Sequence, residues 1–376
     1  MEYLQNIKDL NALANSVFMA NCVGKVNSFP EFITVMPLAK CNYNCVMCAE
    51  SERHTDKELS PEALAKLEGI LPFAKTLFIT GGEPLLYSHL ERLLRSGSKA
   101  GCALWMVSNG ALLTERKREM LLDTGLSQLK ISLDAATSKT YRKIRGGNFL
   151  KVLNNIGQMV ELKYKRGVQL PALQLGFVAM RSNIAELGKL AVIASNLGLD
   201  SIYVTYCTIH YEHMVDESLY FHQEYSDHHM KKAIMMAQDI GIHLETPPLF
   251  SRKDAQELPG GYADRTLVQC REPWKTMFVR YTGDVNLCCG GGGNCGNLND
   301  AGFMEVWNHP ARIKARELVN TPNPLPACKA CHTVKQDSHH VGTHIPDKRL
   351  AALGLERFGN AEAKGGEGEC GLEAAV

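Results

Sequence analysis

The sequence predicts an α/β protein built on an open, parallel barrel of six strand–helix units, a partial (β/α)6 TIM-type barrel. Between residues 31 and 245, short apolar runs alternate with longer stretches of helical periodicity, a pattern typical of βαβ units. A region rich in cysteine and glycine follows, which indicates a second, smaller domain. Functional loops of such barrels lie at the carboxyl ends of the strands.

Each element is assigned from its periodicity and flanking residues. The expected barrel strands are 32–36, 76–80, 103–108, 128–133, 173–180 and 201–206. The expected helices are 61–70, 88–100, 115–124, 149–166, 184–197 and 225–240. In the second domain we expect strands at 276–281 and 284–287, and one helix over 303–318.

Changes in composition set the domain boundaries. Residues 1–30 hold an N-terminal helix, centred on the amphipathic segment 4–13, and a linker, and residues 31–245 form the barrel. Proline and glycine pairs mark 246–265 as a linker, and residues 266–345 form the second domain. The tail, residues 346–376, has too little apolar content to pack and is expected to be disordered.

The overall composition excludes several classes of partner. The formal net charge is +1, from 41 basic and 40 acidic residues, so the chain has no global field for nucleic acid or an anionic membrane. We find no apolar run of about 18 residues and no signal peptide. The sequence therefore predicts a soluble, cytoplasmic protein without nucleic-acid or membrane partners.

Thirteen cysteines cluster in two regions, which in a cytoplasmic chain favours metal ligation over disulfides. Cys41, Cys45 and Cys48 lie on a loop directly after the first predicted strand. A structural zinc site needs four ligands, whereas three thiolates on a four-iron cluster leave one iron open. On spacing alone, incidental cysteines or a zinc site completed from elsewhere stay possible.

The second predicted strand ends in Gly81-Gly82-Glu83-Pro84. Together with the Cys-x3-Cys-x2-Cys loop one strand earlier, this motif resembles the radical S-adenosylmethionine (SAM) superfamily. The resemblance implies that Cys41, Cys45 and Cys48 hold a [4Fe–4S] cluster whose open iron binds SAM. It also implies reductive cleavage of SAM to a 5′-deoxyadenosyl radical that abstracts a substrate hydrogen, with an electron donor such as flavodoxin or ferredoxin.

The same resemblance implies a set of SAM contacts. They are Met47, Gly81, Gly82, Glu83, Ser108, Asn109, Ser132, Asp134 and Arg145. Glu83 would accept from the SAM ammonium, Ser132 and Asp134 would bind the ribose, and Arg145 would bind the carboxylate. From the residues alone, Ser108 and Ser132 could equally serve as turn or cap residues, and Arg145 as a solvated helix charge.

The later cysteines are similar to the auxiliary-cluster extension of the SPASM/twitch subfamily, including its Gly-x4-Cys, Gly-Asn-Leu and Trp-Asn features. Asp337 stands where the full pattern has another cysteine, which favours the twitch form with a single auxiliary cluster. The resemblance implies that this auxiliary [4Fe–4S] cluster is bound by Cys270, Cys288, Cys328 and Cys331. Cys289 or Cys295 could replace one of them, and a zinc ribbon is the alternative.

A closed auxiliary cluster favours electron transfer, and thus a radical SAM oxidoreductase or epimerase acting on a small polar metabolite such as a sugar or aminocyclitol. The alternatives are a maturase of ribosomally made peptides and, in another class, a non-catalytic iron–sulfur electron carrier or redox sensor. Candidate catalytic residues follow the sixth strand or belong to the extra thiols: Tyr206, Cys207, His210, Glu212, Cys289 and Cys295.

Overall fold

The computed structural model describes residues 2–49, 55–251, 269–289 and 293–329. Its centre is one curved sheet, in which these residues form ten strands in the order β10-β9-β8-β1-β2-β3-β4-β5-β6-β7. The barrel strands, all parallel, are β1 (Phe32–Val35), β2 (Thr76–Ile79), β3 (Ala103–Ser108), β4 (Gln128–Ser132), β5 (Ala172–Ala179), β6 (Ser201–Tyr206) and β7 (His243–Glu245). The predicted open, parallel barrel is confirmed.

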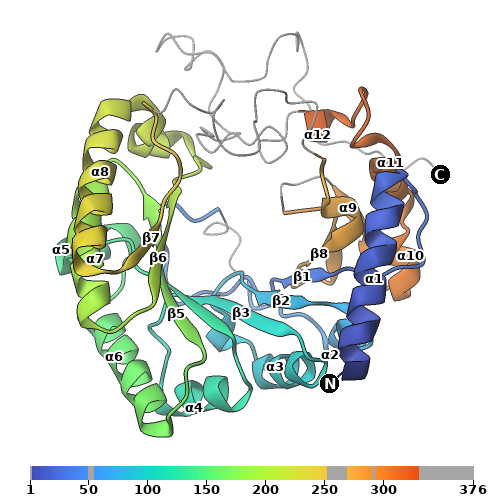
Figure 1. The fold of residues 1–376 in the computed structure, drawn as a ribbon, viewed down its shortest axis with the longest axis horizontal. Helices are drawn as coiled ribbons and strands as arrows, with labels where there is room; N and C mark the ends of the chain where they lie inside the picture. The colour runs from blue at the N-terminus through green and yellow to red at the C-terminus, as the bar shows by residue number, and fades with distance from the viewer. Residues whose placement is uncertain (1, 50–54, 252–268, 290–292, 330–376) are drawn as a thin grey trace.

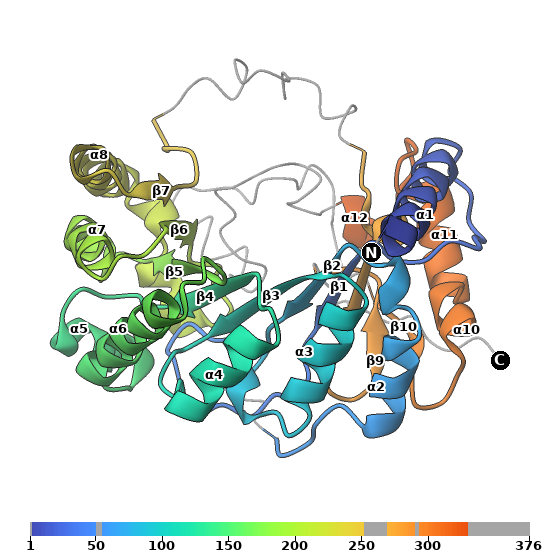
Figure 2. The same cartoon turned by 60° about the horizontal axis from the view of Figure 1, so that its bottom comes forward.

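Helices cover the outer face of this sheet (Figures 1 and 2). They are α2 (Pro61–Glu68), α3 (Leu90–Lys99), α4 (Glu115–Asp123), α5 (Ser138–Arg145), α6 (Phe149–Arg166), α7 (Leu187–Asn196) and α8 (Gln223–Ile240). In β2, β3 and β4 alternate residues are buried against them, and Leu129 and Ile131 of β4 are fully buried. Their neighbours on the inner face stay accessible, and Trp105 of β3 is 37% exposed. The inner face can therefore receive a ligand.

The second region continues the barrel sheet instead of forming a separate body. Strand β8 (Thr276–Val279) pairs in parallel with β1. Strands β9 (Asp284–Asn286) and β10 (Asn294–Asn297) follow as antiparallel neighbours.

No helix in the described ranges is long and apolar enough to cross a bilayer.

The described residues of this region also form the helices α9 (Glu272–Lys275), α10 (Phe303–Trp307), α11 (Pro310–Leu318) and α12 (Pro326–Lys329). The single helix predicted over 303–318 is wrong, because Pro310 has no backbone N–H to continue α10 and instead opens α11 after the N-cap His309. Cys331, the tail and most of the predicted linker lie outside the described residues.

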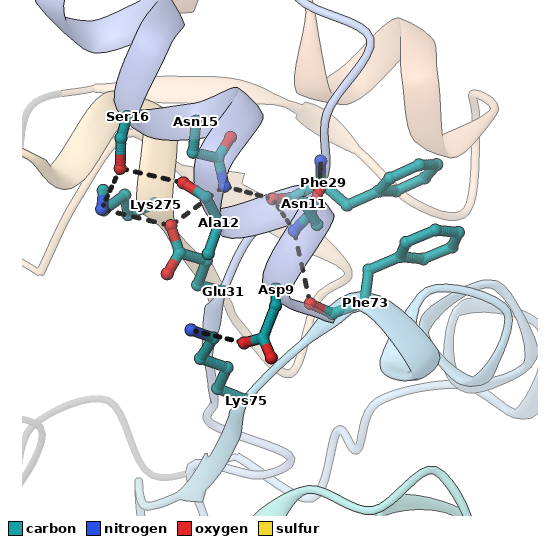
Figure 3. Close-up of polar contacts among 10 residues, drawn as sticks. All are labelled: Asp9, Asn11, Ala12, Asn15, Ser16, Phe29, Glu31, Phe73, Lys75 and Lys275. Atoms are coloured by element: carbon teal, nitrogen blue, oxygen red, sulfur yellow. Dashed lines mark hydrogen bonds and ion pairs between the residues drawn. The ribbon is translucent and has the colours of Figure 1, made fainter. Parts of the chain in front are cut away.

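The N-terminal helix α1 (Glu2–Ala20) is longer than predicted and packs beside the start of the barrel. Its buried side chains are polar (Figure 3). Asn11 Nδ2 donates to Phe29 O at 2.9 Å and to Phe73 O at 3.3 Å. Lys8 Nζ donates to Gly101 O at 2.7 Å. Hydrogen bonds to loop carbonyls thus fix this helix on the barrel.

Candidate active site at the carboxyl ends of the strands

The loop that carries Cys41, Cys45 and Cys48 leaves the carboxyl end of β1 and is held by the segment that ends α5. Val46 N donates to Ile144 O at 3.0 Å. The Tyr43 ring lies against Gly147, where a Cβ atom would stand only 2.2 Å from the ring. Gly147 therefore leaves the space that the cysteine loop needs.

The turn after β2 packs directly on the chain that enters the cysteine loop. Gly82 N donates to Leu38 O at 3.0 Å, and Glu83 N donates to Lys40 O at 2.9 Å. A Cβ on Gly82 would lie 2.1 Å from Lys40 O, and Gly81 has a φ of +112°. Both positions therefore require glycine, because the turn after β2 and the segment from Leu38 to Lys40 approach each other closely through their backbones.

Glu83 is fully buried and joins the turns after β2 and β3. Its Oε1 accepts from Ser108 Oγ at 2.7 Å and from Leu85 N at 3.1 Å, and its Oε2 accepts from Asn109 N at 2.8 Å. Burial raises the pKa of Glu83, while these donors act in the opposite direction. The predicted contact of Glu83 with the SAM ammonium would have to be made in addition to these three.

The thiols of Cys41 and Cys45 each receive a side-chain N–H donor. Asn109 Nδ2 lies 3.8 Å from Cys41 Sγ, and Arg145 Nη1 lies 3.7 Å from Cys45 Sγ. Tyr43 N also donates to Cys41 Sγ at 3.4 Å. Such donors favour the thiolate, which is the form that binds iron.

Asp134 and Arg145 form a buried ion pair, with 2.5 Å between Asp134 Oδ2 and Arg145 Nε. Asp134 Oδ1 also accepts from Val178 N at 2.7 Å. Both predicted SAM contacts are therefore already engaged with each other or with the sheet, and Arg145 is placed beside Cys45. Ser132 lies half-buried at the end of β4, and Met47 packs against the cluster that contains Ile144.

The donor set fits a four-iron cluster. Cys41 and Cys48 both act electrostatically on Cys45, whose pKa burial raises to about 11, so iron binding must displace a proton. No three Cys, His, Asp or Glu side chains of the described segments gather tightly enough to hold one metal ion.

Three of the four predicted auxiliary ligands come together near α9. Burial raises the pKa of Cys270 to about 12, and the thiols of Cys328 and Cys288 act on it in the same direction. Cys270 N donates to Asn320 Oδ1 at 2.8 Å, and Asn320 Nδ2 donates to Cys270 O at 3.1 Å. The fourth, Cys331, lies outside the described residues.

Two arginines of α11 form a buried feature of this region that the sequence did not predict. Arg312 and Arg316 are fully buried and lie 4.5 and 4.7 Å from the ring of Trp307. Arg312 lies beside Cys295, which is 1% exposed, and its charge lowers the pKa of that thiol while burial raises it. The available signal was their spacing of four, which places both on one face of the helix.

The candidate catalytic residues lie in different environments. Tyr206 OH donates to Pro248 O at 3.1 Å, and burial raises its pKa to about 12. Cys207 is buried, and burial likewise raises its pKa to about 12. His210 is half-buried, whereas Glu212 and Cys289 are exposed.

Sequence reasoning placed Tyr211 in a polar loop expected to contact the substrate but did not single it out. Its hydroxyl donates to the carbonyl oxygens of Cys48 and Ala49, both at 3.3 Å. The loop after β6 therefore touches the end of the cysteine loop. The available signal was the position of Tyr211 in a polar loop at the carboxyl end of a barrel strand.

Sequence comparison gives two family matches. Residues 35–177 match the radical SAM superfamily, and residues 270–332 match the SPASM iron–sulfur cluster-binding domain. A probable GTP 3′,8-cyclase of Methanococcus maripaludis is 25% identical over 80% of this chain and 90% of its own. The AdoMet-dependent heme synthase of Methanosarcina barkeri is 29% identical over 46% of this chain. This chain spans about half the length of most of the curated relatives it matches.

Solved structures with the same fold cover more of the chain. Streptococcus suis SuiB bound to its precursor peptide SuiA has a TM-score of 0.64 at 15% identity, over 94% of this chain and 79% of SuiB. AnSMEcpe with bound AdoMet and Cp18Cys peptide has a TM-score of 0.54 at 16% identity, over 82% of this chain and 87% of its own. SuiB has also been crystallised with S-adenosylmethionine.

The two matched segments contain the predicted cysteine motifs in the predicted order. The first implies SAM and a [4Fe–4S] cluster as cofactors, and the second implies an auxiliary iron–sulfur cluster. The chain therefore belongs to the radical SAM superfamily and carries a SPASM/twitch-type auxiliary cluster domain after its barrel.

Proposed function

We propose that this radical SAM enzyme oxidises or epimerises a small polar metabolite, such as a sugar or an aminocyclitol. The observation that carries the proposal is the polar inner face of the barrel. Gln128 Nε2 donates to Gln174 Oε1 at 3.2 Å, and Gln174 Nε2 donates to Ser201 Oγ at 3.0 Å. A row of hydrogen-bonding side chains suits a hydroxylated or aminated substrate.

Lys130 of β4 adds a positive charge to this face. Its Nζ lies 3.7 Å from the centroid of the Tyr203 ring, and a Cβ at Gly176 would stand only 3.3 Å from its stem. Among the described residues, Lys130 forms no ion pair within 4.0 Å. A half-buried cation of this kind favours a sugar that carries a carboxylate or phosphate group over a cationic aminocyclitol.

The chain's own residues divide the work. When bound, the cluster and SAM supply one-electron cleavage of SAM and hydrogen abstraction from the substrate. Asn109 and Arg145 hold the thiols of Cys41 and Cys45, and Glu83 fixes the turns around them. Gln128 and Ser201 are the first residues of β4 and β6, so this row of side chains lies at the amino ends of the strands and would bind the substrate from the floor of the barrel.

The names of the sequence relatives support a small-molecule substrate, since one is a probable GTP 3′,8-cyclase and another an AdoMet-dependent heme synthase. The second candidate function is peptide maturation. It is supported by the fold shared with SuiB, which binds the precursor peptide SuiA, and with anSMEcpe, which binds a Cp18Cys peptide. Both readings use the same SAM chemistry and differ in what enters the barrel.

Anaerobic reconstitution tests the shared chemistry first. We expect about eight iron atoms per chain, since two four-iron clusters are implied. With dithionite and SAM, the protein should form 5′-deoxyadenosine, and Cys45→Ala should abolish it. A fully loaded protein that never cleaves SAM would leave the electron carrier or redox sensor as the function.

Deuterium transfer then separates the two substrate classes. The reconstituted enzyme is incubated with SAM in deuterated extracts, one fraction holding metabolites below about 1 kDa and the other holding peptides. Deuterium should enter 5′-deoxyadenosine only with the metabolite fraction. Deuterium transfer from the peptide fraction alone would reject the metabolite proposal and support maturation.

A further inference from the structure

Helix α1 exposes four of its large apolar side chains on the face turned away from the protein, whereas Phe18 and Met19 pack against the core. Four large apolar residues of this face are 75%, 69%, 62% and 51% exposed, in chain order Tyr3, Leu10, Leu13 and Val17. On the opposite face the buried residues are Lys8, Asn11 and Asn15. An ordinary surface helix buries its apolar stripe, whereas α1 exposes an apolar stripe and buries three polar side chains.

Polar contacts fix the helix in this orientation (Figure 3). Asn11 accepts from Phe29 N at 2.8 Å and donates to Phe29 O, and Asn15 Nδ2 donates to the same carbonyl at 2.9 Å. Lys275 Nζ donates to Ser16 Oγ at 3.2 Å. Turning the apolar stripe inward would break these bonds, so the stripe stays on the surface.

The exposed positions repeat with the spacing of a two-helix seam. Alternating steps of three and four connect Tyr3, Asn6, Leu10, Leu13, Val17 and Ala20, and all six are exposed. A strict seam with a period of 3.5 residues is typical of coiled-coil contacts, whereas a core-facing stripe is wider and follows 3.6. The seam residues match a partner helix better than a core.

We propose that two copies of this chain associate by antiparallel pairing of their α1 helices along this seam. In that arrangement Tyr3 lies opposite Ala20 of the other copy, Leu10 opposite Leu13, and Asn6 opposite Val17. The largest seam residue meets the smallest, so the layers have similar volumes, as close packing requires. The symmetry makes the interface isologous, with each patch facing its own copy.

A parallel pair would be less well matched. It would stack Tyr3 on Tyr3 and Ala20 on Ala20, giving one overfilled and one underfilled layer. It would also bring the acidic Glu2 side chains to the same end, whereas the antiparallel pair sets opposite helix ends beside each other.

A membrane surface is a poorer occupant of the seam. Interfacial helices carry Lys and Arg on their polar face. The one lysine of α1, Lys8, is buried against the barrel, and the helix has no other cation. A single pair of helices, each about 28 Å long, buries less surface than a standard interface, which buries about 1,600 Å². We therefore expect a reversible dimer with a dissociation constant in the micromolar range.

Analytical ultracentrifugation of the reconstituted protein, at roughly 1–100 µM under anaerobic conditions, tests the association. The wild type should pass from monomer to dimer, and Leu10→Lys and Leu13→Lys should each weaken the dimer at least tenfold. Leu150→Lys, on α6 and 67% exposed, is the matched control and should behave as the wild type. Circular dichroism and iron content check that each variant folds.

A wild-type protein that stays monomeric throughout, or a folded Leu10→Lys variant that dimerises normally, would overturn the proposal. Photo-crosslinking tests the orientation separately, with p-benzoylphenylalanine in place of Tyr3 and a mixture of ¹⁵N-labelled and unlabelled chains. Mixed-isotope crosslinks should map near Ala20. Crosslinks near Tyr3 would reject the antiparallel arrangement.

Discussion

At the residue scale, Glu83 is the side chain on which the turns of the site depend. The sequence assigned it to the SAM ammonium, but its two carboxylate oxygens accept from Ser108, Leu85 and Asn109. A motif reveals which residue type is required, whereas the identity of its partners depends on tertiary contacts. This residue therefore has a structural role that the motif alone could not reveal.

We predict that Glu83→Gln destabilises the protein by about 1–3 kcal/mol, because its amide NH2 would face an N–H or O–H donor. Chemical denaturation of the reconstituted protein measures this loss, and iron content should fall with it. Glu91→Gln is the control, since among the described residues Glu91 makes an exposed ion pair with Arg95, and the change should cost less than about 1 kcal/mol. Equal stability of the two variants would contradict the role of Glu83.

Lys130 gives a second prediction at this scale. Lys130→Met keeps most of the stem and removes the charge, so the KM of an anionic substrate should rise about tenfold or more, a cost of about 1.4 kcal/mol. Uncoupled formation of 5′-deoxyadenosine should not change, because SAM is bound elsewhere. Lys130→Arg should restore much of the binding, and an unchanged KM in Lys130→Met would remove Lys130 from the substrate site.

At the scale of elements, helix α11 differs most from what its sequence pattern predicted. Periodicity predicted the strands of the barrel well, because alternate residues are buried against the helices. It could not predict two fully buried arginines, since charged residues ordinarily mark a solvent face. Their burial is stabilised by backbone carbonyls: Arg312 donates to Pro273 O, Thr276 O and Asn286 O.

Replacing Arg312 by Met should lower the free energy of unfolding by about 3 kcal/mol, because Thr276 O and Asn286 O lose this donor, whereas Pro273 O keeps Arg316 Nε at 2.9 Å. Thermal unfolding measures the change. Lys314→Met, at an exposed position of the same helix, should leave the melting temperature nearly unchanged. If both variants melt together, the carbonyl contacts of Arg312 carry little stability.

Local sequence patterns also failed to predict strand β7 and the orientation of helix α1. Strand β7 has three residues, His243, Leu244 and Glu245, too few to show alternation, so it was not predicted. The segment 4–13 was recognised as amphipathic, but a sequence cannot say which face packs. Local pattern thus predicted the type of most elements, whereas edges, buried charges and orientation depended on tertiary contacts.

At the scale of the whole molecule, the two cluster-bearing regions share one sheet. The sequence divided them into a barrel and a separate domain, because proline and glycine pairs between them read as a linker. The pairing of β8 with β1 depends on residues far apart in the chain, which local composition does not report. Cysteine spacing nevertheless identified both regions and their order.

We predict that a chain truncated after residue 251 aggregates, because β1 then has an unpaired edge. Sedimentation of the expressed fragment against the full-length chain measures this. A chain truncated after residue 345 keeps β8 to β10 and should stay soluble. A soluble, monomeric 1–251 fragment would show that the barrel strands need no partner at that edge.

The position of β8 also has a consequence for biosynthesis. Strand β1 is among the first strands to leave the ribosome, yet the neighbour on one side of it is made only when residue 276 has been added. Until then, the strand that leads into the cluster loop is open to pairing with other nascent chains. Iron insertion before β8 docks would occur on an unfinished sheet, so the order of translation favours cofactor loading late, after the C-terminal region has joined.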